Sequence, residues 1–145
     1  MKRFSFLCLA IPMLAFTTGV LADDAKVYKD GPVTDVSFIK IKPGQFDNYM
    51  KWLDGPYKKL MEAQIKAGLV TKYGVFSTEA RNANEADLIL SVTFPNMAAL
   101  DKTDEADAIA AKVMGSNDEQ SKATIERGPM RDVLGSQLMR EMILK

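Results

Sequence analysis

Three short segments rich in β-branched and aromatic residues place apolar side chains on both of their faces, and this limits the possible folds more than any other feature. The segments span residues 33–42, 69–78 and 87–94. Successive residues of a strand point to opposite faces. In the first segment, Val36 and Phe38 share one face, and Val33 and Ile39 share the other. A sheet that is wetted on one side alternates apolar with polar residues, so we predict a sheet that is covered on both faces.

A helical pattern separates the first two of these segments. Between residues 45 and 67, apolar side chains recur every three or four positions, as they do on one face of a helix. They are Phe46, Tyr49, Met50, Leu53, Tyr57, Leu60 and Met61. Gly55-Pro56 interrupts the pattern, and a proline removes a backbone donor and crowds the preceding turn. We expect a kink at this point and the end of the helix at Gly68.

A second helical region follows the third β-rich segment. Asn96 is placed to cap its first turn. The apolar positions change phase near Thr103-Asp104, which predicts a break in the helix. Ser116 and Glu119 have the spacing of a capping box, which predicts a further short helix that ends at Gly128-Pro129.

The last segment, residues 130–145, is ambiguous. Leu134, Leu138 and Met142 are spaced by four, as in a helix, and they would also share one face of a strand. Gly135 is unfavourable in a helix interior. If the segment is a strand, the order of elements is the split βαββαβ arrangement of a ferredoxin-like α+β fold with a four-stranded antiparallel sheet. The simplest cover for the second face of this sheet is a second copy of the chain, which predicts a homodimer.

Residues 1–22 have the composition of a secretory signal peptide. Lys2 and Arg3 give a positive start, a mainly apolar run follows, and Val20-Leu21-Ala22 fits a cleavage site. We therefore expect cleavage near Ala22 and a location in the periplasm or outside the cell. An uncleaved membrane anchor is the alternative, because the run is about long enough to span a bilayer. Residues 23–32 are then a polar leader, residues 33–145 form a single domain, and no later segment reaches the length of a membrane span.

The residue types that are missing exclude several kinds of chemistry. The chain has no histidine, and its one cysteine, Cys8, lies in the expected signal. Zinc, copper and haem iron favour these ligands, so we expect no metal site and no cofactor. Removing Lys2 and Arg3 from a chain of net charge 0 leaves −2, which gives no electrostatic footprint for nucleic acid. The acidic stretch from Asp101 to Asp107 lacks a calcium-loop pattern and is interpreted as a solvated helical face.

Taken together, the pattern resembles a known superfamily. The resemblance is carried by the first strand up to Pro43-Gly44, the Phe46-x-x-Tyr49 sequence, the kinked helix up to Gly68, the strand pair, and the run from Asn96 to Asp101. These features resemble the dimeric α+β barrel proteins, which include antibiotic-biosynthesis monooxygenases, stress-responsive A/B barrels and NIPSNAP-like proteins, and most of all exported bacterial members of this group. The resemblance implies that residues 130–145 form a strand, that two sheets pair into a barrel, and that a pocket lies between sheet and helices. Haem-degrading members use a histidine ligand, which this chain lacks.

Several side chains are candidates for lining such a pocket. They are Tyr49, Trp52, Tyr57, Gln64 and Tyr73. Each also has a structural interpretation, as a core aromatic residue, an interface residue or a buried amide bonded to the backbone. The cations Arg81, Arg131 and Arg140 could bind a carboxylate, although a structural role is favoured for Arg81 and Arg140.

Three functions fit this sequence. The first is binding of a small apolar or aromatic molecule between sheet and helices. The second, suggested by the superfamily resemblance, is a cofactor-independent oxygenase or isomerase that acts on an aromatic substrate. The third is a structural or envelope-stress interaction module, which needs no enclosed pocket. No catalytic residue can be chosen from the sequence.

Overall fold

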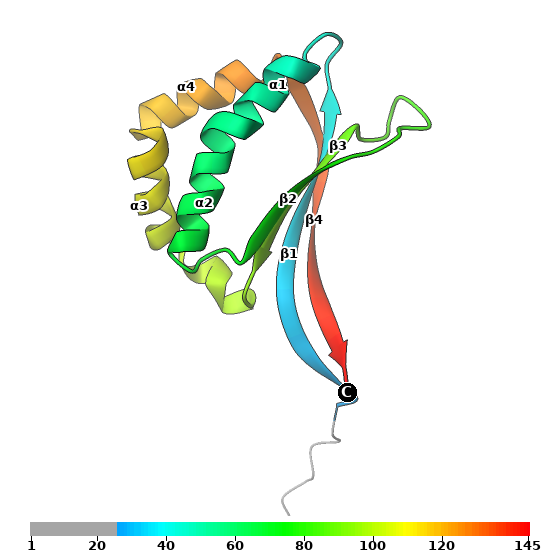
Figure 1. Cartoon of the computed structure of the whole chain (residues 1–145), viewed down its shortest axis with the longest axis vertical. Coiled ribbons are helices and arrows are strands. Elements are labelled where there is room, and N and C mark those ends of the chain that lie inside the picture. The colour runs from blue at the N-terminus through cyan, green and yellow to red at the C-terminus, as the bar shows by residue number, and fades with distance from the viewer. Residues whose placement is uncertain (1–25) are drawn as a thin grey trace, which may run out of the picture.

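The structure of the chain, a computed structural model, describes residues 26–145 as one four-stranded antiparallel sheet with helices on one face (Figure 1). The expected signal peptide, residues 1–22, lies outside the described residues. The strands are β1 (Tyr28–Ile41), β2 (Lys72–Ser77), β3 (Leu88–Phe94) and β4 (Arg131–Leu144), in the spatial order β2-β3-β1-β4. This is the ferredoxin-like α+β fold that the order of elements predicted, and residues 130–145 are a strand, as expected from the resemblance.

The first strand begins earlier than the sequence suggested. We expected a polar leader over residues 23–32 with a turn at Asp30-Gly31-Pro32, but β1 already starts at Tyr28 and pairs there with Leu144. The turn residues instead cause a shift of register between Asp30 and Val33. A proline cannot donate to a neighbouring strand, so the expected turn becomes an irregularity inside the β1–β4 pair.

The kink predicted at Gly55-Pro56 is a single wide turn. Helix α1 (Phe46–Trp52) continues into the π-helical turn η1 (Leu53–Tyr57) and then into α2 (Lys58–Lys66). Pro56 lies inside this turn and has no N–H to donate. The wider turn makes room for the proline ring without breaking the helix.

The second helical region has the breaks that the sequence indicated. Asn96 accepts a hydrogen bond from the backbone N–H of Ala99 and starts the short 3₁₀ helix η2 (Met97–Asp101). Helix α3 (Thr103–Met114) begins at the predicted phase change and ends at Gly115, whose φ of 87° suits glycine. The Ser116–Glu119 capping box opens α4 (Asn117–Arg127), which leads into β4.

The core lies between the helices and one face of the sheet. Ile39, Leu88 and Leu90 from the sheet pack with Tyr49 and Leu53 from the helices. None of the helices within residues 26–145 covers the opposite face (Figure 1), which bears the other set of apolar side chains: Val36, Phe38, Phe76, Ile89, Leu134 and Met139. We call it the open face. Both faces of the sheet thus carry apolar side chains, as the strand pattern indicated, and the cover expected for the open face stays a prediction.

Strand β4 contains a bulge that changes which of its residues share a face. Val133 pairs with Ile39 and Gly135 pairs with Phe38, so Leu134 is the extra residue. Leu134 therefore lies on the open face, whereas Leu138, opposite Asp35, lies on the helix side. The sequence pattern predicted that Leu134 and Leu138 would share one face of a strand. This prediction is wrong, because the bulge interrupts the alternation of β4 between them. Beyond the helices, β1 and β4 continue as a two-stranded ribbon (Figure 1).

Candidate functional site

Four of the predicted pocket residues form a continuous chain of aromatic rings between the helices and the sheet. Tyr49 stacks on Trp52, with ring centroids 5.9 Å apart and an interplanar angle of 7°. Trp52 lies 5.8 Å from Tyr57, and Tyr57 meets the edge of Tyr73 at 6.0 Å. These separations are typical of favourable aromatic pairs. The structure thus brings together Tyr49, Trp52, Tyr57 and Tyr73, which come from α1, η1 and β2.

The π-helical turn places Trp52 in this chain. In a regular α-helix, residues 52 and 57 would point about 140° apart, because each residue rotates by about 100°. A turn with i to i+5 bonding brings positions five apart onto the same side. The sequence pattern placed Trp52 on the flank of the apolar stripe, and the wide turn at Pro56 moves it beside Tyr57.

Two arginines close one end of the aromatic chain. The guanidinium carbon of Arg127 lies 4.4 Å from the centre of the Trp52 ring, and that of Arg131 lies 5.5 Å from the centre of the Tyr49 ring. Both distances fit cation–π contacts. Arg127 also donates hydrogen bonds to the carbonyl of Ala123 and the hydroxyl of Thr124. Arg127 was not predicted, because an arginine in the last turn of a helix is ordinary and nothing else in the sequence distinguishes it.

The polar atoms of this cluster are incompletely paired. The hydroxyls of Tyr49 and Tyr57 and the Nε of Arg131 are buried, and none of them has a hydrogen-bond partner within residues 26–145. Buried polar groups are normally satisfied, and each orphan costs about 1–3 kcal/mol. A bound molecule that reached one of these three buried atoms could form the hydrogen bond that the chain itself does not supply.

Burial and neighbouring charges shift the ionisation of the cluster. Burial raises the pKa of Tyr57 to about 12, with smaller contributions from Tyr49, Tyr73 and the carboxylate of Asp35. Burial also raises the pKa of Tyr49, although the positive charges of Arg131 and Arg127 oppose this. The pKa of Arg127 is lowered, first by burial and then by the charge of Arg131. At neutral pH both tyrosines are therefore uncharged phenols beside two positive charges.

A cavity of about 310 Å³ opens beside Trp52 and Tyr57, between α2 and the pair α3–α4. It lies among the helices and not between sheet and helices, where the sequence predicted a pocket, and Tyr49 and Tyr73 do not line it. Its other lining residues are Leu60, Met61, Met114, Gln120, Thr124 and Arg127. A smaller hollow of about 130 Å³ adjoins it, with Thr124 and Arg127 common to both, and is completed by Gly128, Arg131 and Val133. An apolar cavity with a few polar groups at one end is the usual form of a small-molecule site.

The remaining candidates lie elsewhere. Gln64 is half-buried in the last turn of α2, one turn beyond Leu60, and it does not line the cavity. Its backbone carbonyl accepts hydrogen bonds from the N–H groups of Leu69 and Val70. Arg81 pairs with Glu85 at 3.0 Å, and Arg140 pairs with Asp30 at 3.3 Å. Both arginines thus have partners within the chain.

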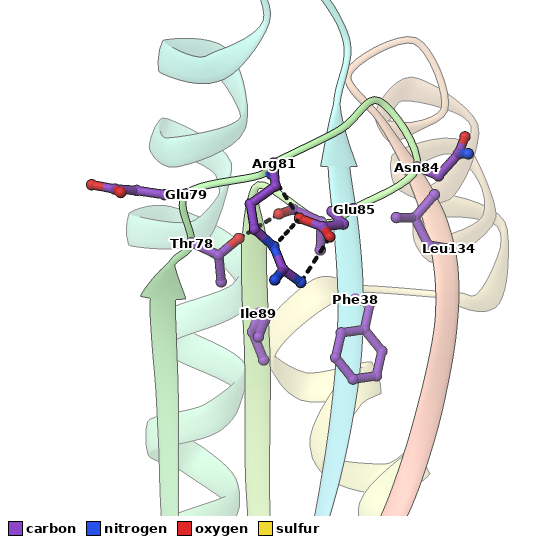
Figure 2. Close-up of a pocket in the computed structure, with 9 residues that line it drawn as sticks. Phe38, Thr78, Glu79, Arg81, Asn84, Glu85, Ile89 and Leu134 are labelled. Carbon is purple, nitrogen blue, oxygen red and sulfur yellow. Dashed lines mark hydrogen bonds and ion pairs between the residues drawn. The ribbon is translucent and has the colours of Figure 1, made fainter.

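A larger hollow, of about 500 Å³, lies on the open face rather than at the aromatic cluster. Figure 2 shows it beneath the β2–β3 loop, with Phe38 and Ile89 from the sheet below and Arg81 hydrogen-bonded to Glu85 above. The walls of this hollow come from the sheet and the β2–β3 loop alone, so it is open to solvent. Its apolar floor is therefore suited to contact with another protein surface rather than to enclosing a small molecule.

The described part of the chain shows neither a metal site nor a membrane-spanning helix. Within residues 26–145, no three carboxylate, histidine or cysteine side chains lie close enough to hold a metal ion. None of the helices in this part of the chain combines the length and the apolar character needed to cross a bilayer.

Comparison with known proteins supports the fold. No protein-family profile and no curated protein matches the chain. A dimeric ferredoxin-like protein from an uncultured marine organism is 8% identical, with a TM-score of 0.50, and the match covers 81% of this chain and 90% of that one. HapK from Hahella chejuensis is 12% identical over 75% and 91% of the two chains, with a TM-score of 0.49. A dimeric protein of unknown function and ferredoxin-like fold from Bacteroides fragilis is 13% identical over 79% and 97%, with a TM-score of 0.42. At these identities the similarity to the marine protein concerns the fold alone.

Proposed function

We propose that this protein binds a small, largely apolar or aromatic molecule in the cavity between its helices, beside Trp52 and Tyr57. The observation that carries the proposal is a mainly apolar cavity lined by Tyr57, whose buried hydroxyl has no partner among residues 26–145, next to a hollow lined by Arg131, whose buried Nε has none. A well-packed core would bury these groups only with partners. The cavity of about 310 Å³ is at the small end of the range for ligand sites, which favours a ligand of one or two rings.

A titration with 2-naphthamide, a neutral two-ring probe, tests this proposal. Trp52 is the only tryptophan of the chain and lines the cavity, so its fluorescence reports on occupancy of the site. We expect saturable quenching of Trp52 and the same affinity by calorimetry. Thr124→Phe, which fills the cavity, should abolish binding, whereas Lys122→Phe, at an exposed position of the same helix, should leave it intact. Equal binding by both variants, or none by the native protein, would refute the proposal.

The open face supports a second part of the proposal, a homodimer formed sheet against sheet. Phe76, Leu134 and Met139 are between 43% and 52% exposed, and they share this face with Phe38 and Ile89. Monomeric proteins seldom expose an apolar area of this kind, which usually marks an interaction site. The marine protein of the same fold is described as dimeric. The ribbon of β1 and β4, with Met142 and Ile143 both exposed, is placed to extend this contact.

A cofactor-independent oxygenase or isomerase is the second candidate, favoured by the position of Asp35. This residue pairs with Val92 and Leu138 on the helix side of the sheet, and its charge acts on Tyr57. A carboxylate next to phenols can remove a proton from a bound aromatic substrate. Oxygen uptake with aromatic quinols tests this activity, which Asp35→Asn should abolish. If no aromatic quinol causes oxygen uptake, binding without catalysis is the function that is left. If the protein also binds no small molecule in the cavity, the third candidate, an interaction module, is favoured.

Export by residues 1–22 completes the proposal. The positive start, the apolar run and the small residues up to Ala22 support it. N-terminal sequencing of protein recovered from the periplasm should begin at Asp23. A chain that retains Met1 in the membrane fraction would identify the segment as an anchor instead.

A further inference from the structure

Arg127 and Arg131 form a pair of neighbouring positive charges that no carboxylate balances. Six ion pairs occur among residues 26–145, and they involve Lys40, Lys42, Lys58, Arg81, Lys102 and Arg140 as the cations. Arg127 and Arg131 take part in none of them. Both side chains are only partly exposed. Charges that are partly buried are normally paired, so the absence of an acid within this region of the structure is informative.

The contacts within the chain satisfy only part of this pair. Arg127 rests on Trp52 and donates to Ala123 and Thr124, which explains its position but supplies no negative charge. Arg131 rests on Tyr49 while its Nε stays buried without an acceptor. A guanidinium carries five N–H donors, so several donors remain available on both side chains.

The geometry gives the missing anion a place. Arg127 and Arg131 both line the hollow of about 130 Å³, which is large enough for a carboxylate. Arg127 and Thr124 also line the larger cavity beside Trp52. A molecule with an anionic group in the hollow and an apolar body in the cavity would use both spaces.

We infer that the ligand is a small carboxylic acid with an aromatic or aliphatic body, and that Arg127 and Arg131 bind its carboxylate. A carboxylate accepts two parallel hydrogen bonds from a guanidinium, which makes arginine its preferred partner. The inference rests on the proposed function, because it assigns the polar end of the ligand for that same cavity. Sequence reasoning had named Arg131 as a possible carboxylate ligand, and the structure adds Arg127 beside it.

A matched pair of probes tests the inference. 2-Naphthoate and 2-naphthamide have the same ring system and nearly the same shape, and they differ in charge. Titration of the native protein by calorimetry should show naphthoate binding at least about tenfold more tightly, the gain expected from charge-assisted hydrogen bonds. Arg127→Gln and Arg131→Gln should each remove this preference, measured as the ratio of the naphthoate and naphthamide affinities of the same variant. Arg81→Gln, which removes the same charge at an exposed site, should keep it.

The outcomes separate this inference from the function on which it rests. Equal affinity for the two probes, or a preference that survives in both arginine variants, would overturn carboxylate recognition and leave binding of an apolar molecule in place. Failure of both probes to bind would overturn the proposed function as well. Arg131→Lys gives a second variant that retains the charge but not the paired donors, and it should lose most of the preference while folding normally by circular dichroism.

Discussion

The carboxylate of Asp87 accepts a hydrogen bond from the backbone N–H of Ile41 at 2.8 Å, at the end of β1. Its other oxygen accepts one from Nζ of Lys40 at 2.9 Å, and the backbone N–H of Asp87 donates to the carbonyl of Ile39. One residue at the end of the β2–β3 loop therefore binds three consecutive residues of the central strand. This places the loop over the open face, where it forms the rim of the hollow described above (Figure 2).

Asp87→Asn should lower the free energy of unfolding by about 1.5 kcal/mol, because it weakens hydrogen bonds that a charged acceptor makes strong. The bond to Lys40 and then the bond to Ile41 hold the pKa of Asp87 below its usual value, against the effect of burial. A lowered pKa means that this stabilisation is complete above the unfolded value of 3.8 and is lost as the pH falls below it. Urea unfolding between pH 2.5 and 7 measures both effects.

The control for this prediction is Asp132→Asn, which removes a similar but more exposed ion pair with Lys42. Exposed pairs contribute little, so this variant should stay within about 0.5 kcal/mol of the native protein. Two results would contradict the role assigned to Asp87. One is an equal change in unfolding free energy for both variants. The other is a decrease in the stability of Asp87→Asn between pH 7 and pH 2.5 as large as that of the native protein.

Tyr57→Phe should make the protein more resistant to alkali. Because the pKa of Tyr57 is raised to about 12, the unfolded chain loses this proton near pH 10 while the folded chain retains it. Stability due to this group is therefore complete below about pH 10 and is lost as the pH rises towards 12. Urea unfolding from pH 8 to 11.5 should show a smaller decline for Tyr57→Phe than for the native protein. An equal decline in the two proteins would contradict the prediction.

The strand faces could be predicted because alternation is a local property. Val33 and Ile39 lie on one side of β1 and Val36 and Phe38 on the other, as the sequence pattern indicated. The capping box at Ser116 was equally local and is present.

The features that could not be predicted depend on irregular backbone or on distant partners. A kink was expected at Pro56, but not that a π-helical turn would carry Trp52 to Tyr57. The bulge at Leu134 reverses the alternation of β4 without a clear local signal. Arg127 belongs to the site only because α4 returns across α1, which brings it over Trp52.

Gly74→Ala should weaken the proposed dimer while changing the free energy of unfolding of the chain only slightly. The ring of Phe76 lies back across Gly74, and a β-carbon at position 74 would come within 2.7 Å of it and 3.1 Å of the Ser91 hydroxyl. The ring is 52% exposed and can move aside, while alanine gains about 0.5–1 kcal/mol over glycine in a strand. We expect a change in unfolding free energy of less than about 1 kcal/mol together with a weaker dimer. A loss above 2 kcal/mol would show that the ring cannot move.

Met139→Lys tests the proposed dimer directly. Met139 lies on the open face, opposite Thr34, and is 43% exposed in the single chain. Two open faces packed together would bury two added charges near one another without partners, which is strongly unfavourable. Light scattering on the mature protein should show a dimer for the native chain and a monomer for Met139→Lys. Ile125→Lys introduces the same charge on α4, where the side chain is 74% exposed, and should remain dimeric. A native monomer would refute the dimer. A dimer that tolerates Met139→Lys but not Ile125→Lys would place the contact elsewhere, because only burial of the open face makes position 139 the sensitive one.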